Sequence, residues 1–245
     1  MTNRNITRRQ CLLGACGLGL GAALNVKAES PLINQSINTE PYPRNADEAL
    51  KRLKAGNQRF MDDKPLHDRQ ESSWRSLLVE TQKPFATILG CSDSRVPPEL
   101  IFDVGFGELF TVRVAGNVIA EDVIGSLQYA VRHLRTSLVV VLGHEKCGAV
   151  SATIEEMINR PTEPEHIGSL IQLIKPGLTS LSMEAHKAGV DKEALVSAAV
   201  EANVRWSMHQ LVTLPAAVKA MREGRGATLM GGIYELETGR VRFLS

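Results

Sequence analysis

The stretch Leu138–Leu142 reads Leu-Val-Val-Val-Leu and is apolar at every position. A strand with one face in water alternates apolar and polar residues, whereas a strand covered on both faces does not. This run therefore predicts a central strand buried on both sides. Further short strand-like runs at 85–89 and 109–114 alternate with segments of helical pattern. The alternation predicts an α/β fold with a mainly parallel central β-sheet flanked by helices.

Helical patterns account for much of the remaining sequence. Asn45 is placed to cap a helix that begins at Ala46, and Glu48 stands where a capping carboxylate would lie. A final pair of strands is expected to be joined by a turn at 237–240. We expect further helices at 69–81, 122–134, 149–158, 167–175 and 192–222, and the last strands at 228–234 and 241–244.

The domain organisation follows from length and composition. A chain of 245 residues can bury one substantial core, and we expect one folded domain at 46–245, entered through an N-terminal helical arm. Residues 31–45 contain three prolines and no regular period, so 29–45 is predicted to be a linker or arm. The formal net charge of +1 gives no reason to expect nucleic acid as a partner.

Residues 1–28 are predicted to be an export signal peptide. Arg8 and Arg9 precede an uncharged, Gly- and Leu-rich stretch at 10–26, and small residues around Ala28 permit cleavage there. The pattern resembles a twin-arginine signal, although Cys11 stands where such signals usually carry Phe. It implies export machinery as a partner and a periplasmic protein. A retained membrane anchor and lipid attachment at Cys16 stay open, but the apolar run is short for either.

Side chains that bind metals follow two of the predicted strands. Cys91 follows the first strand, and His144 and Cys147 follow the third. The carboxyl ends of parallel strands meet at one edge of a sheet, where α/β proteins bind ligands. Two thiolates and one imidazole suit Zn²⁺ in a tetrahedral site with one open position. These residues therefore predict a zinc site, with a Cys91–Cys147 disulfide as the main alternative.

Several motifs together are similar to those of the β-class carbonic anhydrases over about residues 46–245. They are Cys91-x-Asp93-x-Arg95, Arg113-Val114-Ala115-Gly116-Asn117, Gln128-Tyr129-Ala130-Val131 and His144-x-x-Cys147. The resemblance implies that Cys91, His144 and Cys147 bind zinc and that Asp93 and Arg95 form a pair beside it. It also implies a homodimer or a dimer-based higher oligomer with active sites at the subunit interface.

This resemblance implies reversible hydration of carbon dioxide to bicarbonate and a proton. Zinc lowers the pKa of bound water to about 7, so that a zinc-bound hydroxide attacks carbon dioxide. We expect Asp93 to orient this hydroxide and Arg95 to keep Asp93 ionised and off the metal. A purely structural salt bridge is the alternative for this pair. The expected substrate contacts are an apolar pocket at Val114, Ala115 and Phe106, and the backbone N–H of Gly148 for bicarbonate.

The sequence also departs from the family pattern. Some members have a regulatory bicarbonate pocket formed by a Trp, an Arg and a Tyr; Arg113 and Tyr234 match, but Ile88 replaces the Trp. We therefore expect an open site, with water and not Asp93 on zinc. The loop at 104–107 lacks the Gln that binds substrate in many open members. Hydrolysis of carbonyl sulfide or carbon disulfide, and a non-catalytic zinc or thiol-redox role, are the alternative functions.

Overall fold

A computed structural model describes residues 42–159, 164–188, 191–222 and 226–244 of the chain. The predicted signal peptide at 1–28 and most of the predicted arm at 29–45 lie outside these residues. Among the described helices, none combines the length and apolar character needed to cross a membrane.

Five strands in the described residues form one sheet in the order β2-β1-β3-β4-β5. Neighbouring strands from β2 to β4 run parallel, and β5 is antiparallel to β4. The mainly parallel sheet predicted from the sequence is therefore confirmed. The strands are β1 (Ala86–Gly90), β2 (Leu109–Arg113), β3 (Leu138–His144), β4 (Thr228–Tyr234) and β5 (Val241–Leu244).

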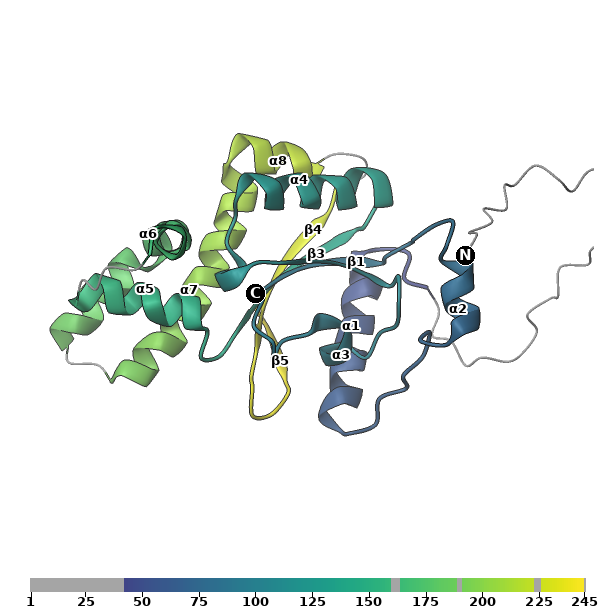
Figure 1. Cartoon of the computed structure of the whole chain (residues 1–245), viewed down its shortest axis with the longest axis horizontal. Helices are drawn as coiled ribbons and strands as arrows, with labels where there is room; N and C mark the ends of the chain where they lie inside the picture. The colour runs from purple at the N-terminus through teal and green to yellow at the C-terminus, as the bar shows by residue number, and fades with distance from the viewer. Residues whose placement is uncertain (1–41, 160–163, 189–190, 223–225, 245) are drawn as a thin grey trace, which may run out of the picture. The chain divides into compact units, whose positions relative to one another are not determined.

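Helices precede, connect and follow these strands. They are α1 (Ala46–Met61), α2 (Ser72–Leu77), α3 (Pro98–Ile101), α4 (Glu121–Tyr129), α5 (Gly148–Asn159), α6 (Glu165–Ala188), α7 (Lys192–Thr213) and α8 (Pro215–Arg222). A 3₁₀ turn, η1 (Ala115–Asn117), follows β2, and a π-helical turn, η2 (Ala130–Leu134), extends α4. Figure 1 shows α4 and α8 on one face of the sheet and α1 and α3 on the other.

Strand β3 lies at the centre of the sheet, and all of its residues are buried. Val139 and Val141 belong to the apolar cluster formed with α4 to α8. Val140 and Leu142 belong to a second cluster that includes residues of α1 and α3. Helices therefore cover both faces, which is why this strand is apolar at every position.

Several helix boundaries differ from the sequence-based expectation. Asn45 caps α1 as predicted, because its side chain accepts a hydrogen bond from the Glu48 amide at 2.9 Å. The helix expected at 167–175 continues through Pro176, and the Trp206 indole donates to the Leu173 carbonyl at 3.0 Å in the turn before that proline. The helix expected at 192–222 breaks at Leu214, which is extended.

A buried ionic cluster joins α1 to the start of β2. Glu108 is 3% exposed and accepts hydrogen bonds from the guanidinium groups of Arg52 and Arg69. Its second carboxylate oxygen accepts the Gly105 amide at 2.8 Å. Charged groups are buried at low cost only when they are paired in this way, so the cluster fixes the loop before β2.

Candidate metal centre

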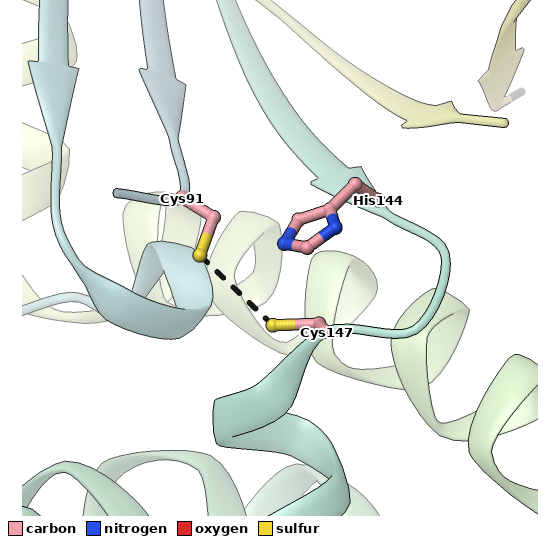
Figure 2. Close-up of side chains that lie close together, drawn as sticks. All are labelled: Cys91, His144 and Cys147. Carbon is pink, nitrogen blue, oxygen red and sulfur yellow. Dashed lines mark hydrogen bonds between the residues drawn. The ribbon is translucent and has the colours of Figure 1, made fainter. Parts of the chain in front are cut away.

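The structure brings together the three residues predicted to bind zinc. Cys91 follows the last residue of β1, His144 ends β3, and Cys147 directly precedes α5. Their ligand atoms all lie within 4.8 Å of one another, and all three residues are buried. Figure 2 shows the two sulfur atoms and the imidazole facing a common space. Three segments that are distant in sequence therefore form one compact donor set.

The two cysteines are separate thiols in this arrangement. Their Sγ atoms are 4.0 Å apart, and both cysteines are free. A disulfide needs an S–S distance of about 2.05 Å. Two thiolates that share a tetrahedral zinc ion with Zn–S bonds of about 2.3 Å lie about 3.8 Å apart. The observed separation thus fits a shared metal ion.

The imidazole of His144 is oriented for metal binding. Its Nδ1 lies 2.8 Å from the Glu145 carbonyl oxygen, and we assign the ring proton to this hydrogen bond. The fully buried Nε2 atom then carries the lone pair, and it has no hydrogen-bond partner among the described residues. An unsatisfied buried acceptor is costly, and a bound metal ion would satisfy it. The residues present therefore fit zinc.

Hydrogen bonds favour the thiolate form of Cys91. The Cys147 thiol, and to a lesser extent the Gly116 amide, lower the pKa of Cys91 to about 4, although burial acts against this shift. The Gly116 N–H lies 3.3 Å from the Cys91 sulfur. The pKa of Cys147 is raised, chiefly because its proton is shared with Cys91 and also because it is buried. Zinc binding would release this remaining proton.

Asp93 and Arg95 form a two-point ion pair beside the three ligand residues. One carboxylate oxygen accepts Arg95 Nε at 2.9 Å, and the other accepts Nη2 at 2.8 Å. This guanidinium holds the pKa of Asp93 well below its usual range. The oxygen Oδ2 of Asp93 also lies 3.9 Å from Nε2 of His144. An ionised carboxylate therefore borders the space into which the metal ligands point.

Arg113 holds the backbone of the Cys91 loop, a role that was not predicted from the sequence. Its Nε donates to the Cys91 carbonyl at 3.0 Å, and its Nη2 donates to the Asp93 carbonyl at 2.7 Å. The parallel pairing of Gly90 with Arg113 places this side chain beside the loop. Tyr234, the other residue matched to a regulatory pocket, lies on β4, and β1 and β3 separate that strand from β2.

Only some of the residues predicted to contact substrate lie near the three metal-ligand residues. Val114 joins β2 to η1 and Ala115 begins η1, next to the Gly116 amide that contacts Cys91. Gly148 begins α5, and a Cβ atom there would meet no heavy atom within 4 Å. Phe106 precedes β2 at the opposite end of the sheet, because Leu109 pairs with Ala86 at the start of β1. The structure therefore does not bring Phe106 to the metal residues of its own chain.

Comparison with known proteins identifies the family. Residues 86–241 match the family model described as carbonic anhydrase. The chain belongs to the carbonic anhydrase family. The carbonic anhydrase of Mycolicibacterium smegmatis is 36% identical over 197 residues, covering 80% of this chain and 92% of the relative. Carbonic anhydrase 2 of Mycobacterium tuberculosis is 35% identical over 203 residues, covering 83% and 92%.

A solved structure indicates the class of carbonic anhydrase. The β-carbonic anhydrase of Aspergillus fumigatus superimposes with a TM-score of 0.63 at 26% identity, covering 81% of this chain and 90% of that chain. The protein is thus a β-class carbonic anhydrase. Zinc is the cofactor of this class, and the buried Cys–His–Cys set is the candidate site for it.

Proposed function

We propose that this carbonic anhydrase hydrates carbon dioxide reversibly to bicarbonate and a proton, with zinc held by Cys91, His144 and Cys147. The observation that carries the proposal is the convergence of these three buried ligand atoms within 4.8 Å. Zinc bound there would supply a Lewis acid that lowers the pKa of a water molecule to about 7 and makes it a nucleophile near neutral pH.

Asp93 and Arg95 act on the attacking water in this proposal. The Asp93 carboxylate accepts a hydrogen bond from the water and so directs an oxygen lone pair toward carbon dioxide. Arg95 keeps this carboxylate ionised through the two-point contact. Because both carboxylate oxygens are bonded to Arg95, the pair supports the open form of the site, in which Asp93 stays off the metal.

Substrate contacts come from the two segments that flank the ligands. Val114 and Ala115 would give carbon dioxide an apolar surface beside Cys91. The backbone N–H of Gly148 would bind bicarbonate, since Gly148 begins a helix of 12 residues and helix N-termini favour anions. The space around the Gly148 Cα leaves room for such a ligand.

The activity can be tested on the purified full-length chain. We expect one zinc ion per chain and rapid hydration of carbon dioxide in a stopped-flow pH-indicator assay, with both lost together in Cys147→Ser. Parallel assays with carbonyl sulfide and carbon disulfide test the alternative substrates. A zinc-loaded protein that hydrates no carbon dioxide but turns over one of these compounds would overturn the proposal.

We also propose that the enzyme is a homodimer or a larger assembly built from dimers. Strand β2 is at the edge of the sheet, so its outer backbone groups are available for pairing. Large apolar side chains are exposed near it, including Leu100 at 54%, Phe106 at 52% and Tyr129 at 47%. The Tyr129 ring contacts that of Phe110 on β2, with ring centroids 6.0 Å apart. A second copy of the chain would cover this surface.

Sedimentation velocity tests this assembly. We expect the wild type to sediment as a dimer or larger and Tyr129→Arg to shift it toward monomer, because a charge would then enter the apolar contact. Val212→Arg is the matched control, since Val212 is 59% exposed on α7. A monomeric wild type, or equal behaviour of the two variants, would contradict the proposal.

We further propose export through the twin-arginine route, followed by residence in the periplasm. The support is the pair Arg8 and Arg9 followed by the uncharged stretch at 10–26. Cell fractionation and N-terminal sequencing of the mature protein test it. We expect a new N-terminus close to Glu29, and retention in the cytoplasm when both arginines are changed to lysine. Unchanged export of that double variant would exclude the route.

A further inference from the structure

Helix α7 carries three buried polar side chains, and two of them, Asn203 and Ser207, lie on a face that is otherwise mainly apolar. Asn203 is 1% exposed and Ser207 is fully buried. They are four residues apart and therefore lie on the same side of the helix. Their buried apolar neighbours on this helix are Leu195, Ala199, Val200, Val204 and Leu211. Burial of polar groups is unfavourable unless they form hydrogen bonds, so their partners indicate what they do.

Both side chains bind the short turn η1. Asn203 Nδ2 donates to the Gly116 carbonyl at 2.8 Å, and Ser207 Oγ donates to the Asn117 carbonyl at 3.0 Å. The N–H of Gly116 donates instead to the Cys91 sulfur, at 3.3 Å. Helix α7 therefore holds the carbonyl groups of Gly116 and Asn117, while the Gly116 N–H contacts Cys91, a proposed metal ligand.

The turn needs such support because its backbone is unusual. Gly116 has φ 69° and Asn117 has φ 44°, both in the left-handed region. Asn enters this region more readily than most residues, but it still does so at a cost that surrounding contacts offset. The hydrogen bonds from α7 supply contacts of this kind.

Helix α7 reaches the turn because it packs closely on β3. A Cβ atom on Gly143 would lie 2.5 Å from Cγ2 of Val204, so only glycine permits this approach. Gly143 directly precedes the ligand residue His144. One helix therefore packs behind the strand that carries His144 and also holds the turn that contacts Cys91.

We propose that Asn203 and Ser207 are positioning residues of the metal centre. They hold η1 in the conformation that directs the Gly116 N–H at the Cys91 sulfur, and so set the orientation and electron donation of this ligand. The inference rests on the proposed role of Cys91 as a zinc ligand. Helix α7 supplies no ligand itself but contributes in this way to the zinc affinity of the site.

Metal binding by Asn203→Ala and Ser207→Ala tests the proposal. Chelator competition measures the zinc dissociation constant, and we expect about a tenfold weaker affinity in each variant, as for other outer-shell partners. In the cobalt-substituted protein, we expect the thiolate-to-cobalt charge-transfer band to move to lower energy, because a sulfur lone pair loses a hydrogen bond. This spectroscopic change does not depend on turnover.

Asn57→Ala provides a matched control for loss of a buried amide. Asn57 is 3% exposed, and its side chain joins α1 to backbone groups of Gly239 and Val241, each at 2.8 Å. We expect this variant to unfold more easily while its zinc affinity stays within about twofold of wild type, since the side-chain hydrogen bonds of Asn57 go to Ile101, Gly239 and Val241 and to none of the ligand residues. Equal zinc affinity and equal cobalt spectra in all three variants would overturn the positioning role.

The cobalt spectra also distinguish failure of the positioning role from failure of the proposed ligand set. If Cys91→Ser keeps the full charge-transfer band of wild type, Cys91 is not a ligand and the proposed function fails. If that band depends on Cys91 but is unchanged in Ser207→Ala and Asn203→Ala, only the positioning role fails. Ser207→Ala removes a single oxygen atom, so it gives a folded test protein even where Asn203→Ala does not.

Discussion

The Sγ atoms of Cys91 and Cys147 lie 4.0 Å apart, although 56 positions separate the two residues in sequence. This distance suits two thiolates that share a metal ion and is too long for a covalent S–S bond. Whether zinc is bound should therefore determine how reactive the two thiols are. Zinc would protect both thiolates, and its removal would leave two close sulfur atoms with one shared proton.

Chelation should convert the site into one that oxidises readily. We expect Cys91 and Cys147 to resist alkylation and mild oxidants in the zinc-loaded enzyme, and to form a disulfide with each other after zinc is removed. Peptide mapping by mass spectrometry distinguishes this pair from Cys11 and Cys16. Equal reactivity with and without zinc would mean that these thiols do not bind the ion.

Arg95→Lys should lower activity while leaving zinc in place. Lysine keeps the charge but cannot make the two-point contact with the Asp93 carboxylate. We expect kcat/KM to fall by about a hundredfold, a typical contribution of a group that acts on a reacting proton, with one zinc still bound per chain. Stopped-flow assays and metal analysis of the same samples measure the two quantities.

Arg240→Lys is a matched control for this substitution. Arg240 makes the same two-point contact with Glu235, at 3.0 and 2.8 Å, and is similarly exposed, 58% against 50% for Arg95. Exposed ion pairs contribute little, so we expect wild-type kinetics. A similar loss in both variants would remove the special role of Arg95.

Gly116→Ala should disturb the metal centre through the backbone. The residue has φ 69°, and an added Cβ would lie 2.7 Å from Cδ1 of Ile174 and 3.2 Å from Cβ of Ala149. Relief of these contacts moves the amide away from the Cys91 sulfur. We expect weaker zinc binding by chelator competition and a lower unfolding midpoint. Wild-type zinc affinity in a destabilised variant would show that the amide contact has no effect on the ligand.

Glu108→Gln should destabilise the fold without affecting the site. The neutral side chain would leave the buried guanidinium groups of Arg52 and Arg69 without their carboxylate. Breaking a buried ion pair in this way costs about 3–5 kcal/mol, which denaturant unfolding measures. Glu155→Gln, which alters an exposed pair with Lys192, is expected to unfold like wild type. Unchanged stability of Glu108→Gln would show that the cluster is not needed.

The sequence predicts the sheet and the ligand set because both depend on local patterns. The apolar run at Leu138–Leu142 identifies a strand buried on both faces, and the residues that end parallel strands necessarily meet at one edge. His144 ends β3 and Cys147 follows in the next loop, while Cys91 comes directly after the neighbouring strand β1. Their convergence therefore follows once the strands are recognised.

Contacts between elements that are distant in sequence cannot be predicted from local patterns. Arg113 is matched in the sequence to a regulatory bicarbonate pocket of the family, but its position beside the Cys91 loop depends on the pairing of β1 with β2. Asn203 and Ser207 stand in a helical pattern with no signal of their own, because their partners are carbonyl groups of a turn nearly 90 residues earlier, with separations of 87 and 90. Tertiary packing determines these contacts.

The position of Cys91 and Cys147 on separate segments would make a bound zinc ion a cross-link as well as a catalyst. A bond that closes a loop of 56 residues restricts the unfolded chain, and the chain-entropy relation for cross-links gives about 4 kcal/mol for a loop of this length. The zinc occupancy of the site and the free energy of unfolding would then rise and fall together. The enzyme would owe part of its durability to the ion proposed for its turnover.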